Sequence, residues 1–207
     1  SFFEAQERLI REIPIVFHRS LYRSLDFKNR FIGIVGPRGV GKTTLLLQYL
    51  KYQKKPGQTV LYAPLDDIYF SEHTLVGLVR QFVNEYAGEL LILDEVHKYR
   101  AWNQELKNIY DAYPKLQIIF SGSSSLDLVK GHYDLSRRAV LYHLPGLSFR
   151  EYIEFMTGIK FPEIPFSSIL KHHFDLSSDL AKKLNPLKEF KAYLESGYYP
   201  SRLESVL

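Results

Sequence analysis

The chain has 207 residues, a net charge of +4 and no cysteine. This length is enough for one well-buried α/β domain with a small helical addition, and it excludes a pair of large domains. Disulfides and thiolate metal sites are excluded as well, and since no apolar run reaches the about 18 residues of a membrane helix, we expect a cytoplasmic protein without membrane contact.

The first part of the chain predicts a helix, a strand, a glycine-rich loop and a second helix. Residues 2–12 form an amphipathic pattern, 31–35 are a short apolar run, and 43–55 have helical apolar spacing. The loop after the strand matches the Walker A pattern G-x-x-x-x-G-K-[ST] at every defined position, with Gly36, Pro37, Arg38, Gly39, Val40, Gly41, Lys42 and Thr43. Strand, loop and helix are the context that this motif requires.

This loop has the chemistry of a nucleoside triphosphate site. Its glycines allow backbone conformations in which successive N–H groups point at phosphate oxygens, next to the positive end of the following helix. Lys42 would reach the β and γ phosphates of ATP, and the Thr43 hydroxyl would ligate Mg²⁺. Thr44 completes the expected nucleotide-binding residues. The alternative is a glycine-rich turn followed by a surface lysine.

Strands and helices alternate through the rest of the first 147 residues. Strands are predicted at 59–63, 90–93, 116–120 and 139–142, and helices at 75–86 and 102–113. Together with the strand before the loop, this pattern predicts an α/β fold, a five-stranded and mainly parallel sheet with helices on both faces, as in P-loop NTPases. Ligands of such sheets bind at the carboxyl ends of the strands.

From residue 148 the pattern contains helices only. A capping box begins one helix at Ser148, and Asn185-Pro186 begins another that Gly197 can end. We therefore divide the chain into a core of residues 1–147 and a helical lid or connector of residues 148–207.

Two acidic residues follow the third predicted strand, as in a Walker B motif. Asp94 would hold Mg²⁺, and Glu95 would orient and polarise the water that attacks the γ-phosphorus. The alternative is a pair of helix-capping acids after a core strand. A small-molecule kinase, with Asp66 or Asp67 near the acceptor hydroxyl, would need no such water-activating glutamate.

Two more residues are candidates for catalysis. Ser121 follows the predicted strand 116–120 and could contact the γ-phosphate or the attacking water, or it could close a turn. Arg138 precedes the last strand and could neutralise charge in the transition state, within its own chain or in a neighbouring copy. A plain surface position is the alternative for this arginine.

Several short blocks together resemble one family of ATPases. The tetrapeptide Asp94-Glu95-Val96-His97 also resembles the box of DExH helicases, but these pair two domains, for which the length leaves no room. A closer match covers roughly residues 15 to 200 and consists of the ordered blocks GPRGVGKTTLL, LYAPLDD, LLILDEVHK followed by Trp102, IIFSGSSS, LSRR, LPGLSFREY and GYYP. This set resembles the prokaryotic AAA-superfamily P-loop ATPases whose ATPase domain precedes a C-terminal domain of unknown function.

The resemblance implies ATP and Mg²⁺ as ligands, an extra strand between the loop strand and the acid-pair strand, and an arginine near position 138. The chain departs from the family at Arg137, where glycine is common, and at Ser121, where threonine is usual. It begins with Ser1 and ends at Leu207, soon after GYYP, so we expect a truncated chain whose relatives continue into a second domain.

We expect hydrolysis of Mg-ATP to ADP and phosphate. The helical part would report the nucleotide state to an unidentified protein partner, to the missing C-terminal domain, or to other copies in a homo-oligomer. One alternative is a nucleotide-dependent switch that hardly hydrolyses. Another is a nucleic-acid-stimulated motor, for which the only support is that residues 1–56 hold 11 Lys and Arg against 4 Asp and Glu.

Overall fold

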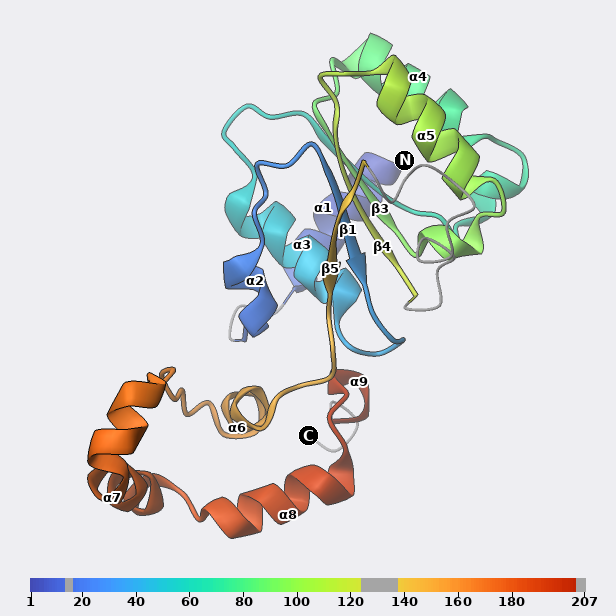
Figure 1. Ribbon diagram of the computed structural model, residues 1–207. Helices are drawn as coiled ribbons and strands as arrows, with labels where there is room; N and C mark the ends of the chain where they lie inside the picture. Colours follow the sequence, from blue (N-terminus) through green and yellow to red (C-terminus); the bar gives the residue numbers. More distant parts are fainter. Residues whose placement is uncertain (14–16, 124–137, 204–207) are drawn as a thin grey trace. The chain divides into compact units, whose positions relative to one another are not determined.

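The computed structural model describes residues 1–13, 17–123 and 138–203 of the chain (Figure 1). Two compact units are present, Ser1–Pro145 and Gly146–Leu207. The boundary predicted from the sequence, after residue 147, lies where the α/β pattern gives way to helices only, and the two units divide after Pro145. Arg137, which marked a departure from the family pattern, lies outside the described residues.

The first unit is built around a five-stranded parallel sheet. The strands are β1 (Phe31–Val35), β2 (Val60–Pro64), β3 (Leu90–Asp94), β4 (Gln117–Gly122) and β5 (Val140–His143). They lie in the order β2-β3-β4-β1-β5, so β4 is the extra strand between β1 and β3 that the family resemblance implies. The α/β fold predicted from the sequence is confirmed.

Helices cover both faces of this sheet (Figure 1). On one face, α4 (Leu75–Tyr86) and α5 (Trp102–Ala112) pack apolar side chains against the strands. The other face holds α3 (Lys42–Gln53), in which Leu45 and Leu46 are fully buried. A buried glutamine of α1 (Phe2–Glu12), Gln6, accepts a hydrogen bond from the backbone N–H of Tyr62 at 2.7 Å, and so α1 covers the open edge of β2.

Four strands, β2, β3, β4 and β5, end later than predicted, and the difference in β4 concerns a candidate site residue. The pairing of Val35 with Gly122 continues the ladder between β1 and β4 through residues 121 and 122. Ser121 was predicted to follow the strand, but it lies inside β4 and is fully buried. The apolar run at 116–120 marked the core of this strand, whereas its end is set by pairing with β1.

The second unit is helical, as predicted. It contains α6 (Phe149–Thr157), α7 (Phe166–Lys183), α8 (Pro186–Ser196) and α9 (Pro200–Leu203). The capping box of Ser148 and Glu151 begins α6, and Asn185 caps α8 with Pro186 in its first turn. Among the described residues, no helix is both long enough and apolar enough to span a bilayer.

Candidate active site

The Walker A loop connects β1 to α3 at the carboxyl edge of the sheet. Gly39 and Gly41 adopt φ values of 83° and 92°, a region that residues with a side chain rarely enter. Gly36 is required for a different reason, because a Cβ at this position would collide with the carbonyl oxygen of Leu144. Gly41 caps α3, so the positive end of that helix faces the loop.

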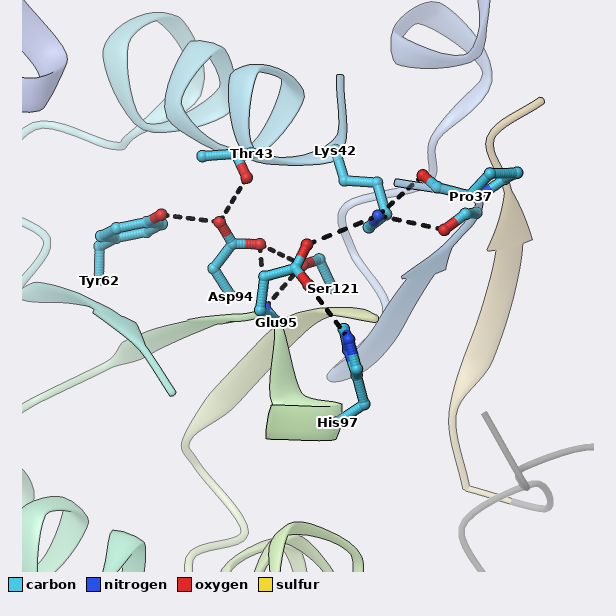
Figure 2. Close-up of polar contacts among 9 residues, drawn as sticks. Pro37, Lys42, Thr43, Tyr62, Asp94, Glu95, His97 and Ser121 are labelled. Atoms are coloured by element: carbon cyan, nitrogen blue, oxygen red, sulfur yellow. Dashed lines mark hydrogen bonds and ion pairs between the residues drawn. The ribbon is translucent and has the colours of Figure 1, made fainter. Parts of the chain in front are cut away.

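Lys42, the first residue of α3, is only 4% exposed. Its ammonium donates to the carbonyl oxygens of Gly36 and Pro37, at 3.1 and 3.0 Å, and lies 3.6 Å from Oε1 of Glu95 (Figure 2). A buried ammonium must be paired or hydrogen-bonded to remain charged. The loop carbonyls and the carboxylate therefore hold this cation at the place where Walker A lysines meet phosphate.

Asp94 ends β3 and is only 3% exposed. Its Oδ2 accepts hydrogen bonds from the hydroxyls of Thr43, at 2.6 Å, and Tyr62, at 2.9 Å (Figure 2). Burial, and after it the negative charge of Asp94, raise the pKa of Tyr62 far above its usual value, so this tyrosine stays a donor. Tyr62 lies 32 positions before Asp94. Sequence reasoning included it in the block LYAPLDD but assigned it no role at the site.

Ser121 joins the two acidic residues from the neighbouring strand. Its hydroxyl donates to Oδ1 of Asp94 and accepts the backbone N–H of Glu95 at 3.0 Å. The same N–H also contacts Oδ1 of Asp94 at 3.1 Å. The serine thus fixes the Walker B turn. Its predicted contact with a γ-phosphate or a water stays a prediction.

Glu95 points away from Asp94 and toward Lys42 (Figure 2). Its backbone has φ 52° and ψ 42°, a left-handed conformation that breaks β3 and redirects the side chain. Oε2 of Glu95 lies 3.3 Å from Nε2 of His97, and Nδ1 of His97 is buried with no hydrogen-bond partner among the described residues. The two adjacent acids therefore have different neighbours: Asp94 contacts Thr43 and Tyr62, and Glu95 lies near Lys42 and His97.

A polar cavity of about 300 Å³ opens beside these side chains. It is lined by Arg38, Lys42, Asp66, Glu95, His97, Lys98 and Ser123. Cations and a partly exposed carboxylate that share a cavity at a helix N-terminus can bind an anion and still leave a base for water.

The structure does not bring Arg138 to this cavity. Arg138 lies just before β5, at the amino edge of the sheet, and its Nε is 3.3 Å from Oδ1 of Asp111 in α5. The Walker A loop lies at the carboxyl edge. A contact from Arg138 to phosphate within one chain would need this ion pair to break and the segment to move, whereas a contact to a neighbouring copy stays a prediction.

The residues fit a magnesium ion with a bound triphosphate. The hydroxyl of Thr43 and the carboxylate of Asp94 supply oxygen atoms at one point, which is the ligand type that Mg²⁺ takes. Magnesium sites of this kind use one or two protein groups together with the phosphates of the substrate.

The strand order, the Walker A loop and the acid pair define the class of P-loop NTPases. Residues 28–153 match the family model of the AAA domain, and the chain belongs to this family of AAA-superfamily P-loop ATPases. The uncharacterized protein MJ1637 of Methanocaldococcus jannaschii is 33% identical over 189 residues, which cover 86% of this chain and 39% of that protein. The chain thus spans well under half the length of this curated relative.

Two solved structures share the fold at low identity. The replication initiator DnaA bound to AMPPCP and single-stranded DNA has a TM-score of 0.53 and 21% identity, over 98% of this chain and 58% of that one. The S. cerevisiae Hsp104-ADP complex has a TM-score of 0.56 and 15% identity, over 95% of this chain and 31% of that one.

Proposed function

We propose that this chain hydrolyses Mg-ATP to ADP and phosphate with Glu95 as the general base. The observation that carries the proposal is the position of Glu95, whose carboxylate lies in the polar cavity 3.6 Å from Lys42 while Asp94 is held separately by Thr43. This division of roles suits a hydrolase, because one acid serves the metal and the other serves water.

The residues of the chain support the following steps. The loop N–H groups and Lys42 bind the β and γ phosphates, and Lys42 gives up its contacts with Gly36 and Pro37. Thr43 and Asp94 would hold Mg²⁺, which neutralises phosphate charge. Glu95 accepts a proton from water as the water oxygen attacks the γ-phosphorus. The bond from that phosphorus to the β–γ bridging oxygen breaks, and ADP leaves.

Hydrolysis would be coupled to a conformational or binding change outside the first unit. We propose that the helical unit Gly146–Leu207 passes the nucleotide state to a protein partner, to a further C-terminal domain or to other copies of the chain. The 39% coverage of the M. jannaschii relative supports a further domain. The DnaA and Hsp104 structures, with AMPPCP and ADP, support an adenine nucleotide as ligand.

The first test compares the chain with its Glu95→Gln variant. We expect phosphate release from Mg-ATP to fall at least about 100-fold, while a labelled ATP analogue binds both proteins with similar affinity. Glu85→Gln on the exposed surface of α4 is the matched control and should release phosphate normally. Equal turnover in the wild type and in Glu95→Gln would refute Glu95 as the base.

A nucleotide-dependent switch is the second candidate. The ion pair of Arg138 with Asp111 favours it, since it holds the predicted charge-neutralising arginine away from the cavity of its own chain. Tight nucleotide binding without phosphate release, at low and at high protein concentration, would support the switch. Turnover that rises with protein concentration and is lost in Arg138→Ala would instead support an arginine supplied by a neighbouring copy.

A nucleic-acid-stimulated motor is a lesser candidate. Its support is the basic balance of residues 1–56. DNA or RNA should then raise phosphate release, and the increase should fall with added salt.

A further inference from the structure

Arg19 is a buried arginine that no sequence motif marks. It lies just before α2 (Ser20–Ser24) and is only 5% exposed. Its guanidinium donates to two backbone carbonyls, Nη1 to Val40 at 2.6 Å and Nη2 to Pro145 at 2.7 Å. We propose that Arg19 is a positioning residue that holds the Walker A loop in its phosphate-binding conformation.

The contact with Val40 fixes one peptide group of the loop. In a trans peptide the C=O of Val40 and the N–H of Gly41 point in opposite directions. Because Arg19 holds the carbonyl, the N–H of Gly41 points away from Arg19, and in the proposed binding mode this N–H faces a phosphate. Rotation of this peptide would turn the amide away from a phosphate.

The glycines of the loop make such a rotation easy. Gly39 and Gly41, on either side of Val40, have φ values of 83° and 92° and no Cβ to restrict them. Glycines allow the backbone to curve around a phosphate. The same flexibility means that the loop is less well held in its binding conformation before the ligand arrives. A buried, charged donor on the intervening carbonyl restores that order, because charge-assisted hydrogen bonds are stronger than neutral ones.

The second contact anchors Arg19 to the body of the sheet. Pro145 follows β5 in the first unit, and the N–H of Leu144 donates to the carbonyl of Val35 at 2.8 Å. Gln48 of α3 also donates to the carbonyl of Phe17 at 2.7 Å, which holds the segment that carries Arg19. The guanidinium therefore bridges the loop to a fixed point, and a side chain with one donor group would not serve both carbonyls equally well.

The inference rests on the proposed function and concerns the affinity for phosphate. Arg19→Met keeps most of the side-chain volume and removes both contacts, and Arg19→Lys keeps the charge with one compact donor. We expect the Kd of a labelled ATP analogue to rise about tenfold in Arg19→Met, with a smaller rise in Arg19→Lys. KM for ATP should rise similarly, while kcat at saturation changes less than twofold.

Inorganic tripolyphosphate, used as a competitor, tests the loop without the base and ribose. Its Kd should rise by the same factor as that of the ATP analogue, because the loop binds the part that the two ligands share. Arg30→Met is the matched control. Arg30 also donates to a backbone carbonyl, that of Tyr110 at 2.8 Å, so its loss should lower the thermal midpoint and leave both Kd values unchanged.

The outcomes separate this inference from the proposed function. If the wild type binds neither ATP nor tripolyphosphate, the proposed function fails. If the wild type binds and both Arg19 variants bind equally well, the positioning role alone fails. If Arg30→Met loses as much affinity as Arg19→Met, then Arg19 acts only through general stability and does not position the loop. If Arg19→Met does not fold, the Kd of Arg19→Lys decides in the same way.

Discussion

The hydroxyl of Tyr62 donates to Oδ2 of Asp94 across two neighbouring strands, at 2.9 Å. Thr43 donates to the same oxygen, at 2.6 Å. If Thr43 turns toward a magnesium ion, Tyr62 remains as the donor that orients the carboxylate. Residues that orient a metal ligand affect metal affinity even without touching the metal.

We expect Tyr62→Phe to raise the Mg²⁺ concentration for half-maximal binding of a labelled ATP analogue about tenfold. Titration of Mg²⁺ at fixed nucleotide measures this value, and nucleotide binding in EDTA should not change. Tyr99→Phe is the matched control, since its hydroxyl donates to another carboxylate, Glu105, at 2.8 Å. A Mg²⁺ requirement that is identical in Tyr62→Phe and wild type would contradict this role.

The same tyrosine should make the fold sensitive to alkali. Its pKa is raised in the fold by burial and by Asp94, whereas an unfolded tyrosine loses its proton near pH 10. The stabilisation is complete below about pH 10. Above it, the unfolded chain releases a proton that Tyr62 retains, so the contribution of Tyr62 to stability falls by about 1.4 kcal/mol per pH unit.

Denaturant unfolding between pH 8 and pH 11 measures this loss. In Tyr62→Phe the fall above pH 10 should be shallower by that amount. If the free energy of unfolding depends on pH in the same way in Tyr62→Phe and in the wild type, Tyr62 does not contribute to the loss of stability at alkaline pH.

His97 should position the general base. Its Nε2 lies 3.3 Å from Oε2 of Glu95, whereas Lys42 lies near the other carboxylate oxygen, Oε1 (Figure 2). We expect His97→Ala to lower kcat for phosphate release about tenfold with little change in KM, because a misplaced base costs rate more than binding. His73→Ala, at an exposed histidine before α4, is the control. A loss confined to KM would assign His97 to substrate binding instead.

Gly36→Ala should displace the loop. The added Cβ would collide with the carbonyl oxygen of Leu144, which is backbone and cannot turn aside. We expect nucleotide affinity to fall by more than about tenfold, measured by displacement of a labelled ATP analogue. Gly77→Ala within α4 is the control, and retained affinity in Gly36→Ala would show that the loop yields to a methyl group.

The sequence predicts the parts of this site whose residues lie close together along the chain. The Walker A loop lies within eight consecutive positions, and Asp94 and Glu95 are adjacent after an apolar run, so motif and strand pattern locate them together. The parallel sheet follows from the same alternation of patterns. His97 was singled out by its place in the tetrapeptide, and its contact with Glu95 required the structure.

The remaining features depend on contacts between distant positions. Tyr62 reaches Asp94 only because β2 pairs with β3, and Arg19 reaches Pro145 across 126 positions. Neither residue type is unusual in its local sequence. Ser121 was placed outside its strand because pairing with β1, which no single segment encodes, sets where β4 ends. Arg138 was judged by its nearness to a strand, although it precedes that strand and so lies at the opposite edge.

The carbonyl oxygens of the Walker A loop compete with phosphate for the ammonium of Lys42. The ammonium already holds the carbonyl oxygens of Gly36 and Pro37, so a phosphate that arrives exchanges one set of oxygens for another. Affinity is then a difference between two well-bonded arrangements. A phosphate would have to replace the neutral carbonyls through its charge. We therefore expect the loop to prefer ligands with a high density of negative charge over nucleosides without phosphate.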